Sequence, residues 1–430
     1  MLKRTRSFLV LVMLLMTVTM SAQVTTATMS GKVTAQDEPI IGATIVAIHE
    51  PSGTRYGTVT NVSGQFNLQG MRTGGPYKVE ISYVGYQTAI YKGINLLLGE
   101  NYVLNVSLKE SSELLDEVVV TASKESNMKS DRAGAIMNAN RDMISNTPTI
   151  SRSISDIMRL SPQGADVGNG FAVGGGNYRQ SFVTVDGAAF NNTFGLGGNL
   201  PANGSPISLD ALEQVTVAVT PFDVRQSGFT GGAINAVTRS GDNQFRGTAY
   251  MYFNNENLKG SKVDDYELLR SKAQYYTYGA SFGGPIIKDK LFFFVNGEYE
   301  DNVTAGSNYR PRTALGESYS GGNIHRPLQS DMDDMRGFLL NKYNFDPGKY
   351  NDYSTDTPAY RVMARVDWNA NQNNKVSFRF TKTHTKDSNF PTSSVSPLST
   401  SALYPGGTST EVIDGKPVGT IAPGQGRTSK

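Results

Sequence analysis

Alternation of apolar and polar residues is the strongest pattern in the chain, and it is concentrated after residue 243. The clearest run covers residues 360–369. Its apolar face would carry Tyr360, Val362, Ala364, Val366 and Trp368, and its other face Arg361, Met363, Arg365, Asp367 and Asn369. Similar runs cover residues 293–300 and 375–381, and weaker ones cover residues 245–253 and 275–283. Because side chains alternate between the two faces of a strand, each run predicts a strand with one apolar and one polar face.

The connections between these five predicted strands alternate in length. Residues 285–290 and 369–374 are expected to form tight turns, whereas residues 254–274 and 301–359 would form long loops. Outer-membrane barrels show this alternation because their periplasmic turns are short and their extracellular loops are long. Strands of about nine to eleven residues are also long enough to cross a bilayer. We therefore predict the first strands of a transmembrane antiparallel β-barrel, with the first strand running outward.

Five strands cannot close such a barrel, because single-chain bacterial barrels have an even number of strands, about eight or more. Residues 388–430, rich in Pro, Gly, Ser and Thr, are expected to begin another external loop. An open sheet edge in hydrocarbon would leave backbone groups unpaired, at a cost of several kcal/mol for each group. The sequence therefore predicts an incomplete, truncated barrel over residues 242–430, as in a fragment of a longer protein or a truncated gene product.

The region before residue 110 consists of short predicted strands separated by glycine-containing turns. The expected strands cover residues 31–33, 43–48, 56–60, 65–68, 77–83 and 102–108. About six or seven strands in about eighty residues are typical of an Ig-like β-sandwich. We therefore predict a β-sandwich domain over residues 24–110.

Residues 111–130 are expected to form a linker that contains one extended segment. The segment consists of Asp116, Glu117, Val118, Val119, Val120, Thr121 and Ala122. Its β-prone residues would be an aggregation hazard without a partner strand. An extended segment can add to a sheet edge of another protein through main-chain hydrogen bonds. The segment is therefore a candidate for capture by a partner protein.

Residues 131–241 are richer in Gly, Asn and Ser, with short apolar runs between them. A helix is expected over residues 153–160, capped by Ser153 or Ser155. Asp186 before Gly187 is expected to form a turn rather than a catalytic site. Strands are expected at residues 182–185 and 212–217. Together these elements predict a small α+β domain within a chain that is mostly β.

An export signal is expected at the N-terminus. Lys3, Arg4 and Arg6 precede an apolar run over residues 8–18, and cleavage after Ala22 would make residues 1–22 a signal peptide. The apolar run is shorter than the roughly 20 residues that a helix needs to span a bilayer. The sequence therefore favours export over a permanent helical anchor.

Composition argues against several classes of protein. The 40 Lys and Arg residues nearly balance 38 Asp and Glu residues, so the net charge of +2 gives no basic surface for nucleic acid. The absence of cysteine excludes disulfides, zinc-thiolate sites and a thiol nucleophile. We expect no nucleic-acid partner and no chemistry based on thiols.

Candidate metal and phosphate sites are weak. His49, His325 and His384 lie far apart in the sequence, without the spacing of metal ligands. The acidic segment 331–334 lacks the glycine and the later glutamate of an EF-hand calcium loop. The glycines at 174–176 are not followed by the Lys-Ser/Thr of a phosphate-binding loop. We therefore predict no catalytic residue, no cofactor and no metal site.

Several motifs resemble known families. The first domain resembles the carboxypeptidase regulatory-like domain, a non-catalytic accessory domain, in Gly31-Lys32-Val33, Pro39-Ile40-Ile41-Gly42-Ala43-Thr44-Ile45, Gly57-Thr58-Val59-Thr60, Gly64-Gln65-Phe66 and Tyr83-Val84-Gly85-Tyr86. The α+β domain resembles a plug domain at residues 154–162, at Val185-Asp186-Gly187, and at residues 212–217 and 231–239. In this order, the parts make the chain similar to the N-terminal portion of TonB-dependent outer-membrane receptors, most closely the Oar-like branch.

The resemblance implies a function and a set of partners. Residues 116–122 look like the TonB box, the strand captured by the periplasmic energy-transducing protein TonB. A ligand would bind the outer loops and the plug, and pulling on the TonB box would then open a path through the barrel. The expected location is the outer membrane, with the N-terminal domains in the periplasm. Expected partners are TonB, outer-membrane lipid and an unidentified ligand that is a peptide, a glycan or a chelate. The sequence leaves open whether a surface lipoprotein also sits on the barrel.

Two other hypotheses stay open at the level of sequence. A secreted or surface adhesive protein built of β modules would explain the sandwich and the turn-rich regions, but it leaves the alternating loop lengths as coincidence. A cell-surface peptidase is suggested only by the regulatory-like domain. It lacks any catalytic constellation, so we expect a protein that is not an enzyme.

Overall fold

The structure is a computed structural model. It describes residues 25–110, 118–121, 136–149, 152–167, 170–191, 200, 205–219, 230–258, 260, 262–263, 266–267, 273–305, 310–317, 324–350, 353–371, 374–386, 409–413 and 416–419. The chain divides into two compact units. The first contains residues 1–250, 279–298 and 360–384, and the second contains residues 251–278, 299–359 and 385–430. The expected signal peptide, residues 1–22, lies outside the described residues.

The first domain in the chain is a β-sandwich, as predicted. One sheet contains β1 (Ala27–Ala35), β2 (Glu38–Pro39), β5 (Gln65–Met71), β8 (Asn101–Val103) and β9 (Val106–Ser107). The other has the order β10-β7-β6-β3-β4, formed by Val118–Thr121, Ala89–Leu96, Gly74–Ser82, Thr44–His49 and Thr54–Val59. Alternate residues such as Ile45, Ala47, Val79 and Ile81 are fully buried between the sheets. This two-layer burial is what the period-2 pattern demands.

Two details of the sandwich differ from the prediction. The strand expected at residues 102–108 is divided into β8 and β9, which both pair parallel to β1. Strand β7 was missed because Gly93, in the left-handed region at φ 78°, interrupts its alternation with two consecutive exposed positions. A pattern search for strict alternation cannot find a strand of this kind.

His49 is buried in the sandwich core, with 4% of its surface exposed. Its Nδ1 lies 2.7 Å from the Ser52 hydroxyl, which lies 2.8 Å from the Thr54 hydroxyl. The Tyr77 ring contacts the imidazole edge to face, with 5.0 Å between ring centroids. Burial, together with the nearby Arg72 guanidinium, lowers the pKa of His49 to about 3. The imidazole is therefore neutral at physiological pH.

Residues 136–241 contain a small α+β fold, called the plug fold below. Its mixed sheet has the order β11-β16-β17-β14-β15, formed by Ile136–Ala139, Leu212–Ala218, Ala233–Thr238, Phe182–Val185 and Ala188–Ala189. Around it lie α2 (Arg141–Asn146), α3 (Ile154–Met158), β12 (Gly164–Asp166), β13 (Phe171–Val173), η1 (Tyr178–Gln180) and η2 (Leu209–Ala211). Helix α3 lies inside the predicted span and has Ser153 as its N-cap residue. Every residue of β17 is buried, so it is the central strand.

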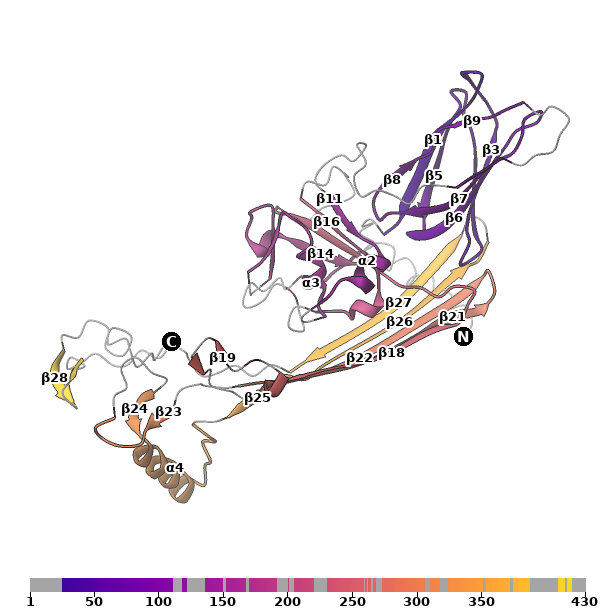
Figure 1. The fold of residues 1–430 in the computed structure, drawn as a ribbon. Helices are drawn as coiled ribbons and strands as arrows, with labels where there is room; N and C mark the ends of the chain where they lie inside the picture. The colour runs from indigo at the N-terminus through magenta and orange to yellow at the C-terminus, as the bar shows by residue number, and fades with distance from the viewer. Residues whose placement is uncertain are drawn as a thin grey trace, which may run out of the picture. The chain divides into compact units, whose positions relative to one another are not determined.

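Five long strands follow, and all five were predicted. They are β18 (Arg246–Asn255), β21 (Gln274–Ile287), β22 (Leu291–Ala305), β26 (Ala359–Asn369) and β27 (Lys375–Thr385). They lie side by side in chain order in one sheet (Figure 1). Tight turns join β21 to β22 and β26 to β27, as expected from the short connections. No helix in the described part of the chain is long and apolar enough to cross a membrane.

The long connections contain more structure than the sequence suggested. Strand β22 continues to Ala305 and pairs there with β25 (Ser354–Asp356), within the region expected to be a loop. The same region contains helix α4 (Gln329–Tyr343), which was not predicted and has no buried residue. The remaining short elements are η3 (Glu256–Leu258), β19 (Lys262–Val263), β20 (Tyr266–Glu267), β23 (Arg310–Arg312), β24 (Ile324–Leu328), β28 (Ser409–Ile413) and β29 (Lys416–Gly419).

In the long strands the apolar face is exposed and the polar face is buried, which is the reverse of the arrangement in a water-soluble sheet. Val362 and Phe378, on the apolar face, are 44% and 67% exposed, whereas Arg361 and Glu298, on the polar face, are 2% and 5% exposed. A soluble sandwich would bury its apolar face. Strands of a membrane barrel face lipid with apolar residues and enclose the polar ones. The burial therefore supports the barrel prediction over an ordinary sandwich.

An arginine on the outward face tests this assignment. We expect Val362→Arg to reduce the free energy of unfolding by about 2–4 kcal/mol, because a charge would enter the hydrocarbon. Reversible urea unfolding in lipid vesicles measures the change. Leu340→Arg in α4 replaces an equally exposed apolar residue, at 46%, and should change stability by less than about 0.5 kcal/mol. Equal effects of the two substitutions would contradict a lipid-facing β26.

The pKa of His49 predicts that the sandwich loses stability in mild acid. The unfolded chain binds a proton near pH 6.5 and the folded domain only near pH 3, so protons favour unfolding between these values. Between pH 6.5 and 5 we expect a loss approaching about 1.4 kcal/mol per pH unit. Hydrogen exchange of the β3 and β6 amides measures this loss. In His49→Gln, which cannot titrate, the slope should be much smaller, and an unchanged slope would assign the effect to other groups.

Candidate functional site: the polar face and the coupling strand

Buried charges cluster where the polar face of the long strands meets the plug fold. The first cluster is centred on Glu298 of β22. Its Oε1 lies 3.0 Å from Nη1 of Arg361 on β26. Its Oε2 accepts hydrogen bonds from the Ser208 hydroxyl at 2.9 Å and from the Tyr250 hydroxyl at 2.5 Å. The carboxylate is therefore satisfied by three donors from three separate segments.

The plug fold reaches this cluster through residues 205–208. Arg361 donates a hydrogen bond from Nε to the Ser205 carbonyl oxygen. Ser208 caps η2, because its hydroxyl accepts from the Asp210 backbone N–H at 3.3 Å, while the same hydroxyl donates to Glu298. Ser208 thus caps η2 of the plug fold and also contacts the sheet of five long strands, called the strand wall below. The cluster joins β22, β26 and the plug fold at a single point.

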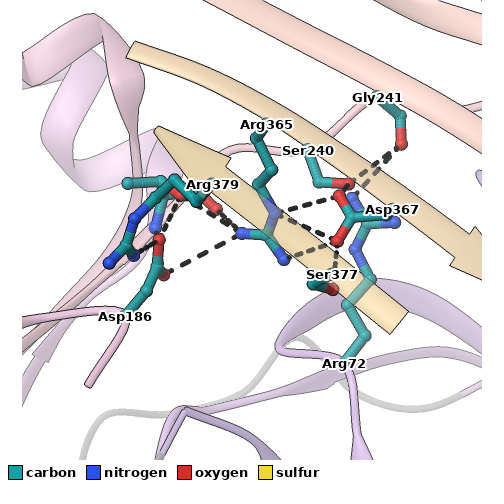
Figure 2. A network of polar contacts seen from close by, with 9 residues as sticks. Arg72, Asp186, Ser240, Gly241, Arg365, Asp367, Ser377 and Arg379 are labelled. Carbon is teal, nitrogen blue, oxygen red and sulfur yellow. Dashed lines mark hydrogen bonds and ion pairs between the residues drawn. The ribbon is translucent and has the colours of Figure 1, made fainter. Parts of the chain in front are cut away.

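The second cluster is centred on Asp186 of the plug fold (Figure 2). Asp186 and Gly187 have φ angles of 45° and 82° and form the two-residue turn between β14 and β15, as the sequence predicted. The turn holds the carboxylate where Oδ1 accepts from the Thr238 backbone N–H at 2.8 Å. The Asp186 carboxylate also forms ion pairs with Arg365, at 3.8 Å, and with Arg379. Residues from two strands of the wall therefore converge on one plug turn.

Arg365 connects Asp186 to a second carboxylate. Figure 2 shows its guanidinium between Asp186 and Asp367, with Nε 2.9 Å from Asp367 Oδ2. Its Nη1 donates to the Thr238 carbonyl oxygen at 2.7 Å, so Thr238 contacts both Asp186 and Arg365 of this cluster. The Ser377 hydroxyl donates to Asp367 at 2.5 Å, and Ser240 also donates to this carboxylate. Asp186, Arg365 and Asp367 each contact an opposite charge and at least one further hydrogen-bonding partner.

Apolar residues complete the contact between the wall and the plug fold. Phe294 and Met363 lie on the otherwise polar face, and both are almost fully buried in the plug core. They pack with core residues of the plug such as Val215 and Ile234. These two positions explain why the predicted polar face is not uniformly polar. Buried ion pairs fix geometry more than they add stability, whereas apolar contacts of this kind are directly stabilising.

The arrangement suits a plug that is held in one position and can still be moved. Ion pairs and hydrogen bonds have strict geometry, so a small displacement of the plug breaks several of them together. Most of the released groups are side chains that water can solvate once the contact opens. Among the described residues, no group of three His, Asp or Glu side chains could hold a metal ion.

The predicted coupling segment is described only in part. Val118, Val119, Val120 and Thr121 form β10, which pairs parallel to β7 of the sandwich. Asp116, Glu117 and Ala122 lie outside the described residues. The role of the segment as a TonB box therefore stays a prediction, while its extended backbone is observed over these four residues.

Sequence reasoning placed Glu298, Arg361, Arg365 and Arg379 on polar strand faces, but it did not identify them as functional residues. The available signal was the recurrence of charged residues at every second position in strands that otherwise face lipid. The partners could not be inferred, since Asp186 was assigned only to a turn. The alternation identifies a face, and the fold determines which side chains meet on it.

Removing one charge from the first cluster tests its importance. We expect Glu298→Gln to reduce the free energy of unfolding by about 3 kcal/mol, because the buried Arg361 would lose its counter-charge. Thermal or urea unfolding in detergent measures the loss. As a matched control, Asp346→Asn removes the carboxylate 3.2 Å from Arg336, an exposed pair that solvent screens, and should reduce stability far less than Glu298→Gln does. Equal losses would show that the Glu298 cluster is solvated.

Two family models match the chain. Residues 28–109 match the carboxypeptidase regulatory-like domain, and residues 237–413 match an outer membrane beta barrel domain. The chain is 27% identical over 256 residues to the TonB-dependent transporter Oar of Myxococcus xanthus, which covers 58% of this chain and 22% of Oar. It is 29% identical over 269 residues to the TonB-dependent receptor SusC of Bacteroides thetaiotaomicron, which covers 59% of this chain and 24% of SusC. The alignments thus span less than a quarter of these curated relatives.

Solved structures with some likeness include two receptors. The siderophore receptor PirA of Acinetobacter baumannii has a TM-score of 0.39 at 17% identity, covering 58% of this chain and 32% of PirA. The ferric enterobactin receptor PfeA of Pseudomonas aeruginosa has a TM-score of 0.40 at 15% identity, covering 59% of this chain and 33% of PfeA. Likeness of this size supports no statement about a ligand. The chain thus contains a carboxypeptidase regulatory-like domain and an outer membrane beta barrel domain and is homologous to the TonB-dependent proteins Oar and SusC, which places it in the outer membrane.

Proposed function

We propose that the chain forms part of a transporter that moves a ligand across the outer membrane into the periplasm, using energy transmitted by TonB from the inner membrane. The observation that carries the proposal is the pair of ionic clusters between the plug fold and the strand wall. Glu298, Arg361, Asp186 and Arg365 hold the plug at defined points by contacts that a displacement would break. A plug attached in this way can block a pore and still be moved aside.

The proposal assigns a role to each region of the chain. Residues 1–22 direct export, residues 24–110 form the periplasmic sandwich, residues 111–130 contain the TonB box, residues 131–241 form the plug, and residues 242–430 contribute barrel strands. Two observations support these boundaries. The carboxypeptidase regulatory-like match lies within the second region, and the barrel match overlaps the last region. No step in this function needs a catalytic residue, and the curated relatives carry the names of a transporter and a receptor.

Replacing Asp116–Ala122 tests the coupling role. A Gly-Ser segment of equal length preserves the spacing but removes the β-prone residues that a partner strand would bind. In cells that carry the full-length receptor, we expect loss of energised uptake and loss of co-purification with TonB. Binding of the ligand to the cell surface should remain. Uptake that continues at the normal rate would exclude this segment as the coupling element.

A second replacement controls for general damage to the receptor by a Gly-Ser segment. A Gly-Ser segment in place of residues 346–350, which follow α4, leaves the proposed coupling path intact. Uptake and co-purification with TonB should be unchanged in this variant. If both variants lose uptake but still co-purify with TonB, the defect lies in assembly of the receptor and not in coupling.

A further inference from the structure

Strand β10 occupies the edge of a sheet in the sandwich. The sheet order is β10-β7-β6-β3-β4, so β10 pairs with β7 on one side and has no strand on its other side among the described residues. The pairing is parallel and in continuous register, with Val118 opposite Ala89 and Thr121 opposite Lys92. The outward row of backbone N–H and C=O groups is the kind of surface to which another strand adds.

The strand that holds β10 is fixed within the sandwich. Ala89 and Ile90 at one end of β7 are 8% and 3% exposed, and Leu96 at the other end is fully buried. Antiparallel pairing with β6 fixes the opposite side of β7. An edge held by buried side chains cannot shift its register without exposing apolar surface. Strand β7 therefore presents one defined row of partners to whichever segment pairs with it.

The path of the chain also leads back to this edge. After β7, β8 and β9 pair with β1 in the opposite sheet of the sandwich, and only then does the chain form β10 beside β7. Parallel neighbours always need such a crossover connection. Here the crossover consists of strands that are themselves part of the domain. The return of residues 118–121 to β7 is thus a feature of the domain's topology.

We propose that the β7 edge of the sandwich is a docking site for Val118–Thr121, which it presents as an ordered edge strand to the partner that captures the coupling segment. This inference rests on the proposed function, because the partner would be the strand-binding domain of TonB. A free segment must lose backbone freedom when a partner strand pairs with it. Docking on β7 imposes that order beforehand, while the outer backbone row of β10 stays open to the partner. Preorganisation of this kind strengthens binding without any new contact.

A disulfide tests the docking and the presentation together. The chain has no cysteine, so Lys92→Cys with Thr121→Cys introduces one pair at positions that face each other in the register. Neighbouring strands lie about 4.8 Å apart, which is within the Cα separation that a disulfide requires. In the full chain, purified in detergent, we expect rapid oxidation to an internal crosslink that mass spectrometry detects. Binding of the soluble periplasmic domain of TonB is then measured before and after reduction.

The matched control is Arg55→Cys with Thr121→Cys. Arg55 is exposed on β4, at the opposite edge of the same sheet, so this pair should not crosslink at the same rate. Equal crosslinking in the two pairs, or none in either, would overturn the docking. Hydrogen exchange of the amides at 118–121 in the unmodified chain provides a second readout, and protection as low as that of a free peptide would also overturn it.

The binding measurement decides whether docking presents or hides the segment. If β7 presents it, the oxidised variant binds the TonB domain at least as tightly as the reduced variant, with a gain of up to roughly tenfold. Weaker binding after oxidation would overturn presentation. Failure of the proposed function has a different signature: the Gly-Ser replacement of residues 116–122 would leave TonB binding unchanged, whatever the crosslinking shows.

Discussion

The structure depends on one constraint, which is that strands in a bilayer must turn their apolar face outward. The polar face is then enclosed and must find partners inside the protein, because unpaired buried charges are costly. The plug fold provides these partners. Glu298 and Arg361 receive them from residues 205–208, and Arg365 receives them from Asp186 and Thr238. Because the apolar face of the strands meets lipid, their polar face meets the plug fold, and the contact with the plug must therefore be polar.

Much of the fold followed from periodicity and turn residues. All five long strands, both faces of each clear run, the sandwich and the position of α3 were predicted from the sequence. Helix α4 was missed because its exposed position leaves no apolar face to detect. Strand β7 was missed because Gly93 interrupts its alternation. Both failures occur where the local pattern lacks the signal on which the prediction relies.

The candidate site was less predictable for a different reason. Its contacts join residues far apart in the chain, such as Arg361 and Ser205, which are 156 positions apart. The coupling segment was recognised as a strand that needs a partner, but not as a strand that pairs with β7 of the same chain. A ladder of main-chain hydrogen bonds leaves little trace in side chains. Which edge a segment joins is therefore settled by the fold.

The two ionic clusters differ in their access to solvent. The Glu298 and Arg361 side chains are each 3% exposed, whereas Asp186 and Arg365 are each 15% exposed. Mobile ions screen partly exposed pairs much more strongly than enclosed ones, over a length of about 8 Å at physiological ionic strength. A rise in ionic strength at the plug would therefore loosen the Asp186 attachment first and leave the Glu298 attachment in place. The resistance of the plug to displacement would then vary with the concentration of mobile ions around it.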